Sequence, residues 1–596
     1  MPTKTSTKRR LGAIATACLL SVALPTAPAW AQKTKTKPGT VAEASTSQPA
    51  PSVSVDVPTI NALSANVDEA TLRDILSGNL IANADALASL TATNITIPTI
   101  RISITDSLAD STIVLENIVL EDVTDGVATT ASVGGMTVGS STGTDGHFGE
   151  MSAKTFDIGG LLRFYGVVDG GGQTEMKTIY SDFVFAGGSF TAPDVTCTIG
   201  AATAAEFKAR PISMSFAEIM ALSTALEEQD EAPSPEILGK LMRTYADMLT
   251  AIESSPVQFD GFDCDGTDDK GNPVNVSVAG MTMGGMSPGI YPSIDLTDMA
   301  VEVTGDGSIT IGSLSFKEID LSAPIAAIQN APDALDDDWF EANLRALIPA
   351  FAGFSIGDVA IDIPDPETPG GRLVASIGAF DLSLGDYLNG IPTNLLTTAS
   401  NLRLDLPADT SDEQLQLLMA LGISSIDAGF TLDANWNEAE NAIAINEVSV
   451  TGVDLATVTL AGTINNATDA LFSINENMMM AAAMGLAVGD LKLDVDDTGL
   501  SDIIMTMVAA DQGSDAATMR PIFAGLAEGT VVGMLAGAAG AQKVAGAVSA
   551  FVSGKAKQLT IDVVAKQAPG LGMMDFMAAQ DDPTVLLGKV NIDASN

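Results

Sequence analysis

A short sequence recurs within the chain and shows how the polypeptide is built. SVGGMTVG spans Ser132 to Gly139, and SVAGMTMG spans Ser277 to Gly284. A third, weaker copy runs from Ser376 to Leu382. In each copy apolar residues alternate with small or polar ones, which predicts a β-strand, and the glycines suit a bend or a close backbone approach. Recurrence of one strand sequence predicts a chain assembled from duplicated strand modules.

The sequence around each copy predicts a module of helices followed by an antiparallel meander. Helical spacing of apolar residues marks Asn66 to Leu90, Pro235 to Glu253 and Asp338 to Ala350, and alternating strands follow. We therefore expect an α+β fold of repeated β-meander modules with packing helices in an extended β-rich architecture. The expected parts are a first module at 58–230, a second at 231–335, a third at 336–470 and an α-rich C-terminal region with closing strands at 471–596.

The C-terminal region is rich in glycine and alanine and is expected to be helical from Leu500 to Phe551. A ridge of small residues like the one it carries occurs in membrane-helix dimers, but the segment is too short and too weakly apolar to span a bilayer. We expect this ridge to pack closely against another backbone inside a soluble domain. Glycines at every fourth position form it: Gly525, Gly529, Gly533 and Gly537.

The N-terminus predicts an exported protein. Four basic residues between Lys4 and Arg10 precede an apolar run from Leu11 to Leu24 and a small-residue site at Ala29 to Ala31. This is the pattern of a secretory signal peptide over residues 1–31, and its apolar run is too short to span a bilayer. Residues 32–57 are rich in Ser, Thr, Pro, Ala and Lys, which predicts a disordered tether. We expect a periplasmic or secreted protein, exported by the general secretory route, with no integral membrane span after signal cleavage.

Two cysteines, Cys197 and Cys264, lie outside the expected signal peptide. In an oxidising compartment they could form a disulfide, and closing a loop of this length would stabilise the fold by about 4 kcal/mol in the chain-entropy model. Two small buried thiols are the alternative, because sequence alone does not supply the proximity that a disulfide needs.

The chain is strongly acidic, with 75 Asp and Glu residues against 28 Lys and Arg and a formal net charge of −47. Such a surface repels nucleic acid phosphates and anionic membrane surfaces, so no nucleic-acid partner is expected. Only 5% of the residues are aromatic, which weakens a carbohydrate-binding interpretation, because such sites need aromatic platforms. Solubility is the simplest explanation of the charge.

The motifs that usually carry chemistry point away from familiar catalytic classes. GxSxG occurs at Ser141, Ser287 and Ser355, but the single histidine, His147, lies too close to Ser141 in sequence to serve as the distal base of a triad. No Walker A or GxGxxG sequence is present, and one histidine with two cysteines cannot build the usual zinc sites. We therefore expect no catalytic residue and no cofactor, and predict that the chain is not an enzyme.

Two weaker metal candidates are present. Met281, Met283 and Met286 have a spacing that could bind Cu(I) through thioethers. The repeat argues against copper, because Met283 corresponds to Val138 in the first copy and Leu382 in the third, as a core strand position would. The second candidate is a possible calcium segment, where a solvated turn is favoured because the glycine and final glutamate of an EF-hand loop are misplaced. Its carboxylates are Asp263, Asp265, Asp268 and Asp269.

The C-terminal part also carries a loose resemblance to a known group of proteins. The stretch from about Phe354 onward is similar to uncharacterised secreted or periplasmic proteins of alphaproteobacteria, a family that implies no catalytic residues. More remotely, the strand-rich periplasmic character resembles AsmA-type envelope proteins, whose β-grooves are associated with lipids. The segments that carry the first resemblance are AFDLSLGDYLNGIPT (Ala379 to Thr393), TLDANWNEAENAIAINEVSV (Thr431 to Val450) and DDTGLSDIIMTMVAADQG (Asp496 to Gly513).

Together these observations favour a non-catalytic binding or scaffold protein of the cell envelope. Its sheets are expected to form an elongated scaffold or an apolar groove for a lipid-like ligand or another envelope protein. An extracellular surface or matrix protein is one alternative. A carboxylate-dependent hydrolase is another, and it would need two close acids in a cleft, one of them with a raised pKa. The ligand and the oligomeric state are left open.

Overall fold

The computed structural model describes residues 52–105, 110–227, 233–365, 370–407, 413–535, 538–582 and 584–596. The expected signal peptide, and the expected tether as far as residue 51, lie outside these ranges. The last residues of that tether form strand β1 (Ser52–Asp56), which pairs with β3 (Ala92–Thr105). The predicted end of the tether was therefore too far along the chain. Val53 and Val55 lie opposite Ile104 and Ile102 and extend the sheet.

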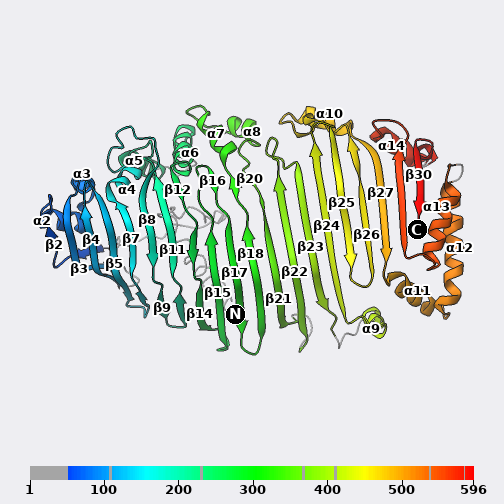
Figure 1. Ribbon diagram of the computed structural model, residues 1–596, viewed down its shortest axis with the longest axis horizontal. Coiled ribbons are helices and arrows are strands. Elements are labelled where there is room, and N and C mark those ends of the chain that lie inside the picture. The colour runs from blue at the N-terminus through cyan, green and yellow to red at the C-terminus, as the bar shows by residue number, and fades with distance from the viewer. Residues whose placement is uncertain are drawn as a thin grey trace, which may run out of the picture. The chain divides into compact units, whose positions relative to one another are not determined.

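A single large antiparallel sheet forms the framework of the described residues, and Figure 1 shows its strands broadly in sequence order, with departures such as the pairing of β8 (Lys177–Phe185) with β11 (Ala202–Ala209) and of β10 (Val195–Ile199) with β14 (Phe262–Thr267). Every strand pairing among the described residues is antiparallel, which agrees with the expected β-rich α+β class. A second sheet is small and consists of β16 (Ile290–Tyr291), β19 (Ile319–Asp320) and β20 (Ala350–Phe351). The other strands of the large sheet are β2 (Asn61–Leu63), β4 (Asp110–Val123), β5 (Val127–Ser140), β6 (Asp145–Phe148), β7 (Met151–Asp157), β9 (Gly188–Ala192), β12 (Ile252–Ser254), β13 (Val257–Phe259), β15 (Pro273–Met283), β17 (Ile294–Val303), β18 (Gly307–Phe316), β21 (Gly353–Pro364), β22 (Arg372–Gly385), β23 (Asn394–Asp405), β24 (Ser425–Asn437), β25 (Ala442–Gly452), β26 (Ala456–Asn465), β27 (Ala487–Asp497), β28 (Gln558–Ala565), β29 (Leu571–Gly572) and β30 (Val590–Ser595).

Most helices lie in connections at one edge of the sheet. Because each strand is antiparallel to its neighbours, alternate connections fall at opposite edges. We call the edge with most helices the helical edge; α9 (Glu413–Ala420), α11 (Leu500–Asp511), α12 (Ala516–Met534) and α13 (Ala541–Val552) follow strands that end at the other edge. The helical edge carries α2 (Glu69–Asp74), η1 (Ile75–Asn79), η2 (Ile81–Asn83), α3 (Ala84–Ala88), α4 (Ile158–Phe164), α5 (Phe216–Glu227), α6 (Pro235–Leu249), α7 (Ser322–Gln329), α8 (Asp337–Asn343), η3 (Asp469–Phe472), α10 (Glu476–Met484), α14 (Met573–Asp581) and α15 (Thr584–Leu587).

The predicted helices are present but differ in length: α6 ends at Leu249, four residues before the predicted Glu253, which lies in β12. Helix α6 begins as expected, because the Ser234 hydroxyl accepts a hydrogen bond from the Ile237 N–H and Pro235 occupies the first turn. The segment expected to be one helix from Asn66 to Leu90 is broken, since Gly78 has φ 114°. Helix α8 is shorter than predicted and ends at Asn343.

The repeated octapeptide lies on β5, β15 and β22, where a small residue of each copy lies opposite a residue with left-handed backbone in the neighbouring strand. In β22, Ala379 pairs with Gly357 and Ile377 with Val359, so Gly378 lies opposite Asp358, whose φ is 51°. A Cβ on Gly378 would approach the Asn401 side chain to 2.7 Å. This confirms that the repeat glycines serve a bend or a close approach. This irregularity at Gly378 and Asp358 also shifts the alternation by one, so that Ile377 and Phe380 share one face of the sheet.

Helices cover the sheet at its two ends. At the N-terminal end Leu72 of α2 and Leu90 pack with Ile95, Ile97 and other residues of β3 and β4. At the C-terminal end Val544 and Ala547 of α13 pack on Leu559 of β28 and Ala594 of β30. None of the strands from β15 to β26 contributes a residue to the hydrophobic clusters of the described chain. The middle of the sheet therefore differs from its ends.

The glycine ridge of α12 does not pack as the sequence suggested. A Cβ placed on Gly525, Gly529 or Gly533 would meet nothing within 4 Å. The fourth glycine, Gly537, lies outside the described residues. The expectation that another backbone approaches this ridge is therefore wrong for the described part of the chain.

Candidate ligand-binding face

One face of the large sheet is apolar along its whole described length. Cross-strand pairing places a row of apolar residues on successive strands, and we call the face that bears this row the apolar face. The row follows from cross-strand pairing, because residues paired on neighbouring strands project from the same face of a sheet. The row consists of Ile97, Ile118, Val133, Met151, Phe185, Ala202, Phe259, Met281, Leu296, Leu314, Ile356, Phe380, Ala399, Phe430, Val450, Val458, Val495 and Leu559.

The opposite face is polar, as the adjacent row of paired residues shows. Only Val119 and Val184 interrupt that row. We call this side the polar face. Its row consists of Thr96, Val119, Ser132, Ser152, Val184, Thr203, Gln258, Thr282, Asp295, Ser315, Ser355, Asp381, Thr398, Thr431, Ser449, Thr459, Asp494, Thr560 and Ser595.

Exposure separates the covered ends of the apolar face from its uncovered middle. Ile95, beneath the N-terminal helices, is 3% exposed, and Leu559, beneath α13, is 8% exposed. In the middle the exposure is uneven: Phe316 is 44% exposed and Val450 is 62% exposed, whereas Leu296 and Ala399 of the same row are buried. We call the part from β15 to β26 the open apolar face. Contiguous exposed apolar surface of this kind marks a site for a ligand, a partner or a membrane.

Phenylalanine rings lie in contact across the open apolar face. The ring centres of Phe316 and Phe354 are 6.5 Å apart, and those of Phe354 and Phe380 are 5.3 Å apart. Phe380 and Phe430 meet at 6.4 Å across β23, where the intervening residue is Ala399. A small residue between two large ones lets the rings touch, and the result is a continuous aromatic strip over several strands.

Charged groups of the polar face pair with one another. The Lys317 ammonium donates to Asp381 at 2.7 Å and to the Ser383 hydroxyl at 2.5 Å. Burial opposes ionisation of Asp381, but these hydrogen bonds outweigh it and lower the pKa of that carboxyl. In β27 the hydrogen bonds of Lys492 and Thr560 lower the pKa of Asp494. These charged side chains therefore stabilise the sheet on its polar face.

The two cysteines lie on the apolar face and are joined to each other. Cys197 of β10 pairs with Cys264 of β14, and the structure links them by a disulfide with an S–S distance of 2.11 Å. Cys197 is buried. The bond ties strands that are distant in sequence and lies outside the open apolar face.

The aspartates proposed as a calcium site divide into two groups. Asp263 and Asp265 lie on β14, where the Asn275 amide donates to both carboxylates. Asp268 instead closes the following turn, because its carboxylate accepts from the backbone N–H groups of Lys270 and Asn272 at 2.8 Å. Asp269 belongs to the same turn. Among the described residues there is no group of three or more His, Cys, Asp or Glu residues arranged to hold a metal ion.

The other sequence candidates fall in separate places. Met281 and Met283 lie on β15 opposite Leu296 and Ile294, on the apolar face, as the core-packing interpretation of this motif requires. His147 lies on β6, where it is paired with Thr137 of β5 and Ser189 of β9. Ser355 lies elsewhere, on the polar face of β21. Every described carboxyl group with a shifted pKa has it lowered, so none shows the raised pKa that a general acid needs.

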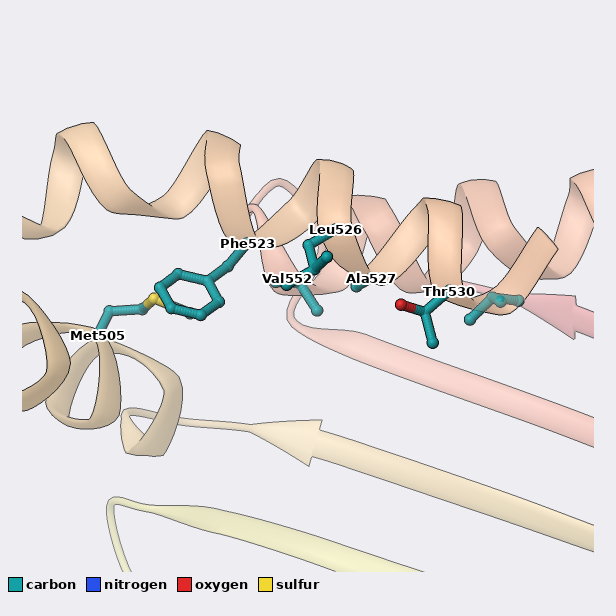
Figure 2. A pocket seen from close by; sticks show the side chains of 7 residues that line it. Met505, Phe523, Leu526, Ala527, Thr530 and Val552 are labelled. Atoms are coloured by element: carbon teal, nitrogen blue, oxygen red, sulfur yellow. The ribbon is translucent and has the colours of Figure 1, made fainter. Parts of the chain in front are cut away.

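A smaller apolar pocket lies among the C-terminal helices. It has a volume of about 400 Å³, and Figure 2 shows Met505 of α11 facing Phe523 of α12, with Val552 of α13 close by. Leu526, Ala527, Thr530 and Val531 complete the lining. This pocket is open to solvent and is much smaller in extent than the open apolar face. The sequence did not reveal that the open apolar face is uncovered.

Comparisons with known proteins bear on the C-terminal part. A family described as "Uncharacterized protein" matches residues 449–596, which include β26 to β30 and the pocket helices. No curated protein matches the chain. Within the described residues no helix has both the length and the apolarity needed to cross a membrane.

Proposed function

We propose that this chain is a non-catalytic, exported envelope protein that binds the acyl chains of a lipid-like ligand on its open apolar face. One observation carries the proposal: the apolar face is covered by helices at both ends and is uncovered from β15 to β26. The expected signal peptide and the remote similarity in style to AsmA-type proteins support the envelope setting.

The dimensions of the face suit chain-like ligands. Strand β22 has 14 residues, which corresponds to about 45 Å at the usual rise of a strand. One acyl chain spans about half of the ~30 Å hydrocarbon core of a bilayer, so it fits within the height of one strand. Each methylene removed from water contributes about 0.8 kcal/mol before the cost of immobilising the chain is subtracted.

Lipid extraction and native mass spectrometry of the purified protein test the proposal. We expect bound lipid in the wild-type protein and a strong loss of it when charges are placed on the open apolar face. Leu373 and Val374 are adjacent on β22, lie on opposite faces and are each 37% exposed. A variant with Leu373→Asp and Leu404→Asp places two carboxylates on the apolar face, where an unpaired charge beside an acyl chain is costly.

The matched control carries the same charges on the polar face, as Val374→Asp with Val564→Asp. We expect the control to keep its lipid. The amount of lipid bound by the apolar-face variant should fall at least about tenfold, which corresponds to roughly 1.4 kcal/mol of binding free energy. A wild-type protein that carries no lipid and takes up none from vesicles would contradict the proposal. Equal loss in both variants would show that charge, and not the face, decides lipid content.

We also propose that duplicated strand modules built the sheet. The three octapeptide copies lie on β5, β15 and β22, each with a small residue opposite a residue with left-handed backbone. Strand β18 repeats the arrangement at Ile311, Gly312 and Leu314, with the small residue Gly312 opposite Asp358. A Cβ on Gly312 would lie 2.8 Å from the Asp358 side chain. Recurrence of one strand unit supports an origin by duplication.

A further inference from the structure

Large exposed apolar side chains gather at the C-terminal part of the helical edge. Methionines carry most of them, although methionine is usually found inside proteins. We call the following set the methionine edge: Met478, Met480 and Met484 of α10 and Met573, Met574 and Met577 of α14, whose exposed fractions range from 50% to 72%.

The two helices of the methionine edge flank the same strand ends. Helix α10 leads into β27, and α14 begins directly after β29. Ala487 of β27 pairs with Gly572 of β29, so Met484 and Met573 lie close to one pair of hydrogen-bonded strands. The Asn465 amide also donates to the carbonyl of Pro569 at 2.7 Å and ties the two connections together. The methionines therefore project from one continuous part of the edge.

Further apolar residues extend this surface toward α8. The Arg345 guanidinium donates to the carbonyl of Ser473 at 3.1 Å, which joins the segment after α8 to the segment before α10. Leu344 is 65% exposed and Ile474 is 63% exposed beside this contact. The exposed apolar surface is thus larger than either short helix alone.

Charge decides which partner fits the methionine edge. The net charge of the chain is −47, which disfavours an anionic membrane or an acidic protein. The Lys589 ammonium already pairs with Asp575 of α14. The interface of a zwitterionic bilayer carries no net charge that would repel the chain, and it accepts flexible apolar side chains.

Position relative to the open apolar face favours the same partner. Ile464 and Val488 pair with each other on the apolar face near the ends of β26 and β27, next to α10. A bilayer at the methionine edge would bring acyl chains to this end of the strands. Resting on the proposed function, we propose that the methionine edge docks on a zwitterionic lipid bilayer, from which an acyl chain passes to the open apolar face.

Flotation of the full exported chain with phosphatidylcholine vesicles tests the docking. We expect the wild-type protein to float with the vesicles, with little dependence on salt, because apolar contact is not screened. A variant with Met480→Glu and Met574→Glu should reduce the vesicle-bound fraction at least about tenfold. The control is Met220→Glu with Met534→Glu, which changes methionines that are 50% and 70% exposed on α5 and α12, and it should float as the wild type does.

All substituted side chains are exposed, so both variants should melt within a few degrees of the wild type. Failure of the wild-type protein to float, or flotation of the docking variant at the wild-type level, overturns the proposal. It is also overturned if sedimentation shows a dimer that the docking variant dissociates without any vesicle binding, because a second copy then covers the edge. Wild-type protein that floats but carries no lipid retains the docking proposal and rejects the proposed function.

Discussion

At the scale of single residues, Asp497 shows how a buried carboxylate organises the start of the C-terminal helices. It is buried at the end of β27, and it accepts hydrogen bonds from the Ser501 N–H at 2.9 Å and the Ser501 hydroxyl at 2.5 Å. Lys557 donates to the same carboxylate at 3.0 Å. Burial opposes ionisation, but the hydrogen bonds from Ser501 and Lys557 outweigh it and lower the pKa from 3.8 to about 2.

The depressed pKa fixes the sign of a pH dependence. A carboxyl group whose pKa is lower in the folded state contributes stability above its unfolded pKa, and that stability is lost as pH falls from about 4 toward 2. Asp497→Asn should therefore destabilise the α11 region by about 1–2 kcal/mol at pH 7, since Lys557 is half exposed and solvent screens the pair. The loss should shrink at pH 2. Hydrogen exchange of α11 peptides measures it, with the exposed neighbour Asp496→Asn as control; equal protection in both variants at pH 7 would contradict the assignment.

At the scale of elements, the local patterns in the sequence predicted the elements well and their neighbours poorly. The Ser234 cap and the apolar spacing of α6 are local signals, and both its type and its start were predicted. The left-handed backbone of Asp358 could not be predicted, because it depends on the glycines of adjacent strands. The packing of the α12 ridge was predicted wrongly for the same reason: a glycine pattern does not say which backbone, if any, approaches it.

The open ridge of α12 makes a prediction about helix stability. A Cβ at Gly525, Gly529 or Gly533 meets nothing, so replacing each glycine by alanine should stabilise α12 by about 0.5–1 kcal/mol through helix propensity. Gly239→Ala in α6 is the matched control, since the added Cβ would collide with the carbonyl of Asp333 and should destabilise that helix. Hydrogen exchange of the two helices distinguishes the cases, and slower opening of α6 with faster opening of α12 would reverse the assignment.

At the scale of the whole molecule, alternation predicted strands but not what covers them. Apolar and polar residues at alternate positions, as in Ile356 and Ser355, assign the two faces of a strand, and the antiparallel pairing of successive strands then aligns these faces along the sheet. Coverage depends on where distant helices pack: α13 packs on β28 and β30, whereas no hydrophobic cluster of the described residues includes a strand from β15 to β26. The open apolar face is therefore a property of the assembled sheet.

An uncovered apolar face should respond to removal of its ligand. Protein stripped of lipid by organic extraction and refolded should bind an apolar fluorescent dye strongly, and lysophosphatidylcholine should displace the dye. The variant with Leu373→Asp and Leu404→Asp should bind several-fold less dye, because its charges interrupt the face, whereas Val374→Asp with Val564→Asp should bind as the wild type does. Added lipid should also raise the melting temperature of the wild-type protein, since a ligand that binds only the folded state stabilises it by mass action. Equal dye binding by both variants would place the exposed surface elsewhere, at the helical edge or on α12, and not on the face that the strands form together.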